Sequence, residues 1–228
     1  MSRKSDLFAR IQRDVIIGVV REESADSARA VADAYLSSGI VHLEVTLTTP
    51  DAIDILESLA AEHSGRGIVF AAGSLRSAED AAAARRAGAQ ILVAPHSDIR
   101  LIEYAMEHDL LCVAGAATPT EIVNAWNLGA DIVKVYPARL LGGPEYFKTI
   151  RQPLRDVPML AGGPVAIEEI ELYLEAGAIA VNLGASLALP ELVREQRWND
   201  IGKRAALAVS MVQARNRSLG SVIPAAVH

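Results

Sequence analysis

The sequence has little aromatic content, a single cysteine and fewer basic than acidic residues. Phe, Trp and Tyr make up only 4% of the chain, so the core must be built mainly from Ala, Val, Ile and Leu. Such a composition is typical of parallel strands that are covered by helices. Cys112 alone cannot form an intrachain disulfide, and its apolar neighbours predict a small buried residue in a reducing compartment.

Positive charge and long apolar runs are also missing. The 22 Lys and Arg are outnumbered by 28 Asp and Glu, giving a net charge of −6, which argues against a nucleic-acid partner. No apolar run is long enough to cross a bilayer, and the N-terminal residues lack the apolar core of a signal peptide. We therefore expect a soluble, cytoplasmic protein that does not bind a membrane.

What the chain does contain is a repeat of short β-branched runs followed by helical patterns. The repeat predicts an α/β protein, a single (β/α)₈ TIM barrel over residues 1–228, with an N-terminal helix in 1–14 and a C-terminal helical region and tail in 190–228. A doubly wound open sheet is the alternative, but Val19–Ser24 after the first run contains no glycine for a dinucleotide loop. The runs begin near Val15, Ile40, Ile68, Gln90, Leu110, Asp131, Val157 and Ile179.

The helical segments carry start and stop signals. Ser77 with Asp80, and Thr118 with Glu121, have the spacing of helix N-terminal capping boxes. Glycines at 88, 129 and 177 are placed to end helices. The predicted helices are Asp6–Arg13, Ala25–Ser38, Pro50–Glu62, Ser77–Ala87, Asp98–Glu107, Pro119–Leu128, Gly143–Arg151 and Ile167–Ala176, and a tail of small residues begins at Ser218.

One lysine lies on a predicted barrel strand. Side chains alternate along a strand, so Lys134 points away from Val133 and Val135. If the valines face the outer helices, Lys134 faces the lumen, where desolvation favours the neutral amine that attacks a carbonyl. A lysine that is merely buried beside a counter-ion is the alternative on these residues alone.

The second predicted strand supplies a carboxylate. His42, Glu44 and Thr46 share one face of this strand, opposite Val41, Leu43 and Val45. Glu44 in the same lumen as Lys134 could move protons on and off a substrate, or could simply neutralise the lysine. We interpret His42 as a hydrogen-bonded lumen residue, and His96 as a loop residue near the site.

Two glycine-containing turns follow the last two predicted strands. Barrel enzymes often bind phosphate at these strand ends, through backbone N–H groups and a helix N-terminus. We expect phosphate to be bound by Gly162 and Gly163 in the first turn, and by Gly184, Ala185 and Ser186 in the second. An amine, a carboxylate and a phosphate site at one end of a barrel predict a phosphorylated keto acid as substrate.

Together these segments resemble the 2-keto-3-deoxy-6-phosphogluconate (KDPG)/4-hydroxy-2-oxoglutarate (KHG) aldolase family over about residues 6–190. Each matching piece occurs in the family's order, which makes the combination more specific than any one of them. The pieces are Gly18–Arg21, Leu43–Thr46, Ala72–Leu75, Ala94–His96, Thr118–Glu121, Val133–Ala138, Gly143–Tyr146 and Gly162–Gly163.

The resemblance implies roles for individual residues. Lys134 corresponds to the Schiff-base lysine of a class I aldolase, and Glu44 to the general acid/base. The resemblance also implies that Arg21, Thr46, Ser74, Pro95 and Tyr136 contact the substrate. Family members are homotrimers and need no metal, so we expect a homotrimer without metal or cofactor.

The chain departs from the family pattern at five places, which include Ala71 at the opening of the strand-three turn and Ala114 before Gly115. Thr48 stands where many members have arginine, Ser74 replaces the usual threonine, and Ala161 replaces the threonine before Gly162. The predicted reaction is cleavage of KDPG to pyruvate and glyceraldehyde 3-phosphate. The alternatives are an aldolase for the galactonate epimer or for 4-hydroxy-2-oxoglutarate, a phosphate-binding barrel enzyme such as an epimerase, and a catalytically silent metabolite-binding homologue.

Overall fold

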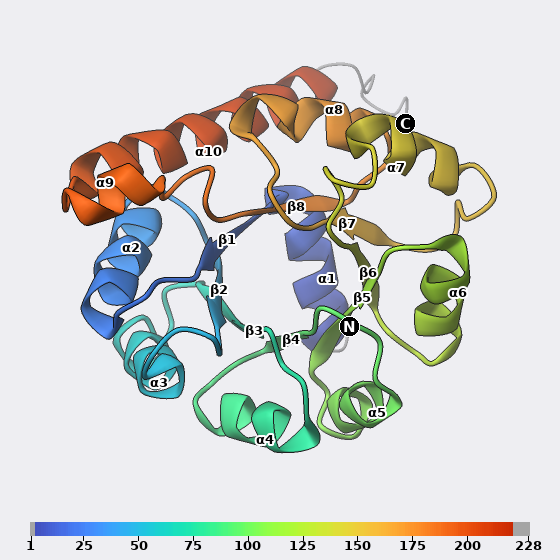
Figure 1. Ribbon diagram of the computed structural model, residues 1–228, viewed down its shortest axis with the longest axis horizontal. Coiled ribbons are helices and arrows are strands. Elements are labelled where there is room, and N and C mark those ends of the chain that lie inside the picture. The colour runs from blue at the N-terminus through green and yellow to red at the C-terminus, as the bar shows by residue number, and fades with distance from the viewer. Residues whose placement is uncertain (1–2, 221–228) are drawn as a thin grey trace, which may run out of the picture.

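The computed structural model describes residues 3–220, which form a closed barrel of eight parallel strands (Figure 1). The strands follow one another in chain order, and β8 pairs with β1 to close the barrel. The predicted (β/α)₈ barrel is therefore confirmed, and the open sheet is excluded. The strands are β1 (Ile16–Val20), β2 (His42–Thr46), β3 (Val69–Gly73), β4 (Ile91–Val93), β5 (Leu111–Ala116), β6 (Ile132–Val135), β7 (Met159–Ala161) and β8 (Ala180–Leu183).

Helices surround the barrel, and each of α2 to α8 follows a strand in the chain (Figure 1). Both predicted capping boxes are present, at Ser77 and at Thr118. Gly88, Gly129 and Gly177 follow helix ends with positive φ, as expected of helix-terminating glycines. The helices are α1 (Arg3–Asp14), α2 (Ala25–Ser37), α3 (Ala52–Glu62), α4 (Ala78–Arg86), α5 (Ile99–Glu107), α6 (Pro119–Asn127), α7 (Gly143–Arg151), the short η1 (Ile167–Glu169) with α8 (Ile170–Glu175), α9 (Pro190–Arg194) and α10 (Trp198–Gly220).

The strands begin one or two residues later than predicted. Val15 shows one reason: its φ of 65° lies in the left-handed region, so it forms the turn between α1 and β1 instead of extending the strand. Asp131 lies just outside β6, although its backbone N–H donates to the Cys112 carbonyl at 3.0 Å. Propensity predicts which residues can extend, whereas a local turn such as the one at Val15 decides where a strand starts.

The alternation of side chains divides the core into two layers. Val133 and Val135 pack with the helices in the outer layer, and Ile132 belongs to the small cluster inside the barrel. Lys134, between the two valines, is only 8% exposed. The prediction that Lys134 points into the lumen is confirmed.

Helix α1 closes the end of the barrel at which the strands begin. Leu7 and Ile11 on this helix are buried in the lumen cluster. At the same end, Nε2 of His42 lies 2.9 Å from Oδ2 of Asp14, where α1 ends. His42 therefore serves the closed end, and a ligand can enter only from the end at which the strands finish.

The C-terminal helical region consists of α9 and α10, and α10 packs against α2. The tail predicted from Ser218 onward lies mainly outside the described residues, since only 218–220 belong to α10. None of the helices in the described part of the chain combines the length and hydrophobicity needed to span a membrane.

Candidate active site

Lys134 on β6 and Glu44 on β2 face each other across the open end of the lumen. Lys134 Nζ lies 3.7 Å from Glu44 Oε1, and the Glu44 residue is 0% exposed. This separation permits an ion pair but exceeds an ordinary hydrogen bond. Oε1 of Glu44 is buried and has no hydrogen-bond partner in the structure. The pair combines an amine with a carboxylate oxygen that is not committed to another group.

The second oxygen of Glu44 has a different environment. Asn182 on β8 donates from Nδ2 to Glu44 Oε2 at 2.6 Å, and Asn182 is 3% exposed. Sequence reasoning did not select Asn182. The available signal was side-chain alternation in β8, which places an amide at a lumen position next to the apolar Val181 and Leu183.

Two glycines leave the space that the reactive side chains occupy. A Cβ added to Gly162 would lie 2.5 Å from Lys134 Cε, and one added to Gly73 would lie 2.0 Å from Glu44 Oε1. Both distances are too short for a carbon to be tolerated without movement of the lysine or the glutamate. These glycines are thus required by the packing of Lys134 and Glu44, and not by an unusual φ.

Arg21, at the end of β1, is oriented by hydroxyl groups. Its guanidinium donates from Nη1 to Thr48 Oγ1 at 3.0 Å and from Nη2 to Ser74 Oγ at 3.1 Å. Thr46 extends the network, because its Oγ1 lies 3.1 Å from that of Thr48. Thr48 and Ser74 are two of the departures from the family pattern, and both contact Arg21.

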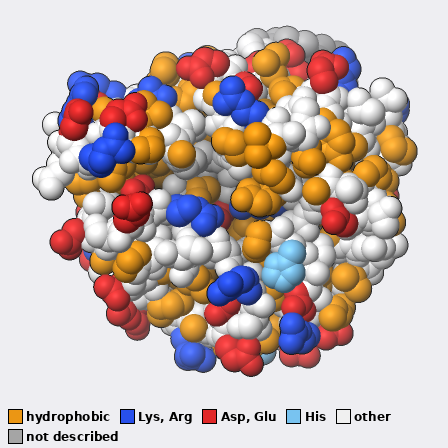
Figure 2. All heavy atoms as spheres, viewed as in Figure 1, with side chains coloured by type: hydrophobic (Ala, Val, Ile, Leu, Met, Phe, Trp, Pro, Cys, Tyr) orange, Lys and Arg blue, Asp and Glu red, His pale blue; other side chains and the backbone are white. Residues whose placement is uncertain are grey.

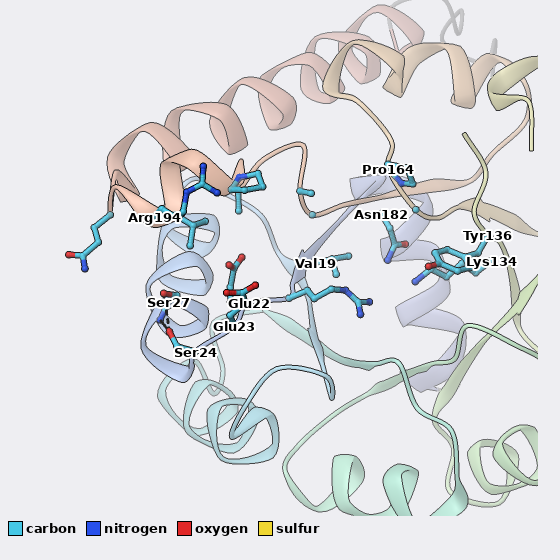
Figure 3. A pocket seen from close by; sticks show the side chains of 18 residues that line it. Val19, Glu22, Glu23, Ser24, Ser27, Lys134, Tyr136, Pro164, Asn182 and Arg194 are labelled. Carbon is cyan, nitrogen blue, oxygen red and sulfur yellow. Dashed lines mark hydrogen bonds between the residues drawn. The ribbon is translucent and has the colours of Figure 1, made fainter. Parts of the chain in front are cut away.

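A cavity of about 820 Å³ opens above these residues. In the space-filling view a hollow lies over the barrel opening, bordered by basic and hydrophobic side chains (Figure 2). Lys134, Tyr136 and Asn182 lie together on one side of the cavity, whereas Glu22 and Arg194 lie toward α2 and α9 (Figure 3). The cavity is large enough for a sugar acid of six carbons.

The two glycine turns after β7 and β8 also border this cavity, through Gly163, Gly184 and Ala185. The N–H of Gly162 instead donates to the Val135 carbonyl at 2.9 Å, so it is committed to the barrel. Ser186 does not line the cavity: its Oγ is buried without a hydrogen-bond partner, and its carbonyl accepts from Arg204 on α10.

An acidic segment that sequence reasoning did not select forms the opposite wall. Glu22 and Glu23 follow Arg21 directly and line the cavity between β1 and α2 (Figure 3). Burial raises the pKa of Glu22 to about 7, and the charge of Glu23 acts in the same direction. Burial also raises the pKa of Tyr35, to which the charge of Glu22 adds, and Tyr35 donates to the Gly184 carbonyl at 3.2 Å. Glu22 therefore lies near the second glycine turn.

The remaining predicted residues lie at the same end of the barrel. Tyr136 follows β6, is 41% exposed, and has its ring centre 5.9 Å from Lys134 Nζ. Pro95 and His96 follow β4 and are exposed. Pro95 packs over Gly115, where an added Cβ would lie 2.2 Å from the Pro95 carbonyl. Neither Pro95 nor His96 lines the cavity.

Within residues 3–220, no group of three or more His, Cys, Asp or Glu side chains is placed to hold a metal ion.

Comparison with known proteins shows that the chain is similar to aldolases. Residues 8–204 match the family model described as KDPG and KHG aldolase. A 2-dehydro-3-deoxy-phosphogluconate aldolase from Zymomonas mobilis is 30% identical over 172 residues, covering 75% of this chain and 80% of that protein. A 2-dehydro-3-deoxy-6-phosphogalactonate aldolase from Escherichia coli is 27% identical over 173 residues, covering 75% and 83%. The crystal structure of KDPG aldolase from Legionella pneumophila superimposes with a TM-score of 0.80 at 24% identity, covering 91% and 98%.

Proposed function

Because the chain belongs to the KDPG and KHG aldolase family of pyruvate-dependent class I aldolases, we propose that it reversibly cleaves KDPG to pyruvate and glyceraldehyde 3-phosphate. The observation that carries the proposal is the buried pair of Lys134 and Glu44, which lies 3.7 Å apart beneath the cavity. A buried lysine can supply the amine that attacks a carbonyl, and a nearby carboxylate can serve as the general base.

The reaction begins at Lys134. Its neutral amine attacks the C2 carbonyl of the substrate, and the carbinolamine loses water to form an iminium. Glu44 Oε1 then takes the proton of the C4 hydroxyl as the C3–C4 bond breaks, and the electron pair of that bond moves toward the iminium nitrogen. The aldehyde departs and leaves an enamine. Protonation of the enamine at C3 and addition of water release pyruvate and restore Lys134.

The other residues at this end bind the substrate. Arg21 and Ser74 hold the carboxylate of the pyruvyl part, because a guanidinium and a hydroxyl present several donors to it. Thr46 supports this network, while Tyr136, which lines the cavity beside Lys134, borders the iminium. The distal phosphate is bound at the turns that contain Gly163, Gly184, Ala185 and Ser186, and Gly162 contributes through the space that it leaves for Lys134.

One observation favours a second candidate substrate. The cavity wall that carries Glu22 and Glu23 lies near the glycine turns. The charge of Glu23 repels a phosphate dianion, and Glu22 adds to the repulsion when it ionises above its raised pKa. An unphosphorylated 2-keto-3-deoxy acid with distal hydroxyl groups would instead donate hydrogen bonds to these carboxylates. Arg194 on the same cavity is the group that would offset the repulsion if the substrate is phosphorylated.

Reduction of the Schiff base tests the covalent step. The protein is incubated with pyruvate and borohydride, and the intact mass and the modified peptide are determined. A pyruvate adduct on Lys134 is expected, and it should disappear in Lys134→Ala. Lys203→Ala is the control, because that lysine lies on α10 and pairs with Asp200 far from the lumen. No adduct, or an adduct on another lysine, would refute the proposal.

Substrate choice requires a separate measurement. We expect a higher kcat/KM for KDPG than for its galactonate epimer, for unphosphorylated 2-keto-3-deoxygluconate and for 4-hydroxy-2-oxoglutarate. A preference for an unphosphorylated acid would establish the second candidate and leave the role of Lys134 intact.

The assembly is proposed from the family resemblance. We propose a homotrimer, for which light scattering should report three times the mass of one chain.

A further inference from the structure

The hydrogen bond between Asn182 and Glu44 joins strands at two different places in the barrel wall. Asn182 comes from β8 and Glu44 from β2, with β1 between them. The bond of 2.6 Å is the one hydrogen bond to the Glu44 carboxylate within the described residues. Lys134 lies on the far side of the same carboxylate, 3.7 Å from Oε1.

A carboxylate buried to this degree needs donors to remain charged. A lysine ammonium provides three N–H donors, but an iminium nitrogen retains only one, and an enamine nitrogen is uncharged. The number of N–H donors and the positive charge that Lys134 offers to the Glu44 carboxylate therefore change during the reaction that we propose. The Asn182 amide takes no part in the covalent steps, so its N–H persists throughout them.

We propose that Asn182 is a positioning residue for the aldolase reaction: it holds Oε2 of Glu44, so that the carboxylate presents Oε1 to C3 of the bound pyruvyl group, the carbon that exchanges a proton. This inference rests on the proposed function. The two oxygens of the Glu44 carboxylate then have separate roles. Oε2 accepts the hydrogen bond from Asn182 on β8, and Oε1 faces Lys134.

Packing alone does not explain an amide at this position. Ala180, the other lumen-facing residue of β8, is apolar, and it belongs to the hydrophobic cluster of the barrel interior. Asn182 also has a cost, because its Oδ1 is buried without a hydrogen-bond partner. An apolar side chain would avoid that cost but would leave the Glu44 carboxylate without its donor.

Exchange of the pyruvate methyl protons tests the inference without a sugar substrate. In the iminium with pyruvate, Glu44 removes a C3 proton to give the enamine, and return of a deuteron in D₂O replaces hydrogen by deuterium. Proton NMR measures the exchange rate, and borohydride trapping measures how much iminium forms. The variants are Asn182→Leu and the near-isosteric Asn182→Asp, each also combined with Glu44→Gln.

Val181→Ala is the matched control. Val181 is the neighbour of Asn182 on β8, but its side chain packs in the outer layer, away from Glu44. Truncation at this site costs stability without altering the carboxylate. The control should exchange pyruvate protons at the rate of the parent protein below its unfolding temperature, which separates a loss of stability from a loss of positioning.

Both Asn182 variants should retain the pyruvate adduct on Lys134 and lose roughly 10-fold to 100-fold in exchange rate, the loss expected when a catalytic group is misplaced. In the Glu44→Gln background, Asn182→Leu should cause no further loss of exchange rate, because both substitutions act through the same carboxylate.

Three results would overturn the inference. One is a parent-like exchange rate in Asn182→Leu, and another is an equal loss in the Glu44→Gln background. The third is a loss of trapping as large as the loss of exchange, which would make Asn182 a support for Lys134. If the parent protein forms no pyruvate adduct, the proposed function fails, and the inference fails with it.

Discussion

At the scale of single residues, small side chains determine where the reactive pair and Arg21 can lie. Gly162 and Gly73 carry no chemistry, yet any side chain at either position would occupy the space of Lys134 or Glu44. Hydroxyls perform a comparable task for Arg21, because Thr48 and Ser74 determine where its guanidinium lies. Small residues thus position the large functional ones.

Gly162→Ala should impair the covalent step while the barrel still forms. The added Cβ would lie 2.5 Å from Lys134 Cε, so the lysine must move. A displacement of about 1 Å can cost on the order of 100-fold in rate, and we expect trapping of pyruvate to slow by about that factor. Gly202→Ala on α10 is the control, since its Cβ would meet Ser38 Oγ at 3.1 Å and the Ala34 carbonyl at 3.7 Å, neither of which belongs to the site. Unchanged trapping in Gly162→Ala would contradict the geometry.

Thr48→Val should weaken substrate binding and leave turnover largely unchanged. The variant removes the acceptor of Arg21 Nη1, and a hydrogen bond contributes a net stabilisation of about 1 kcal/mol, or roughly a 5-fold rise in KM. Thr48→Ser retains the hydroxyl and should resemble the parent. Steady-state kinetics distinguish the two variants, and a fall in kcat with constant KM would place Thr48 in the chemical step instead.

At the scale of secondary-structure elements, three strands bring their functional residues to the same end of the barrel. Lys134 comes from β6, Glu44 from β2 and Asn182 from β8, and parallel closure makes these neighbours across the lumen. Helix α1 has the complementary role, because it fills the opposite end with Leu7 and Ile11. The barrel consequently has one closed and one open end.

Ile11→Ala in helix α1 should lower stability without removing the chemistry. Ile11 is fully buried in the lumen cluster, and truncation of a buried isoleucine costs about 2–5 kcal/mol of unfolding free energy. Denaturant unfolding measures the loss, and pyruvate trapping at low temperature should persist. Leu207→Ala on α10 is the control, because that side chain is 53% exposed. If Ile11→Ala lowers the unfolding free energy no more than Leu207→Ala does, then the packing of α1 in the closed end of the barrel does not stabilise the fold.

At the scale of the whole molecule, ionisable groups at the two ends of the barrel make stability depend on pH in opposite directions. At the closed end, burial raises the pKa of Asp14, but hydrogen bonds from His42 and Arg13 outweigh this effect and leave the pKa well below its ordinary value. At the open end, the pKa of Glu22 is raised. A carboxyl group with a lowered pKa loses its stabilising effect in acid, whereas one with a raised pKa destabilises the fold when it ionises.

Glu22→Gln should reduce the loss of stability between weakly acidic and neutral pH. Glu22 has a pKa of about 7 in the folded chain and an ordinary value of 4.5, so the folded chain holds the proton that the unfolded chain has released. Unfolding free energy therefore falls as pH rises through this window. Thermal unfolding at pH 5 and pH 7.5 should show a larger fall for the parent than for Glu22→Gln. Equal pH dependence in the two proteins would contradict the raised pKa of Glu22.

The sequence by itself determined the barrel, the elements and the face on which the reactive residues lie. The repeat of β-branched runs and helical patterns, and the alternation of Lys134 with two valines, follow from the periods of strand and helix. Those periods depend on local geometry, so they can be read without knowledge of distant contacts. The ordered motifs also indicated the aldolase family.

Only the tertiary structure decided which groups meet. Asn182 and Glu44 are 138 positions apart in the chain, and their hydrogen bond exists because β8, β1 and β2 are adjacent in the closed barrel. The approach of Gly162 to Lys134, and the position of Glu22 at the cavity wall, have the same origin. Local periodicity establishes which way a side chain points, whereas the distance to its partner depends on barrel closure and packing among residues remote in sequence.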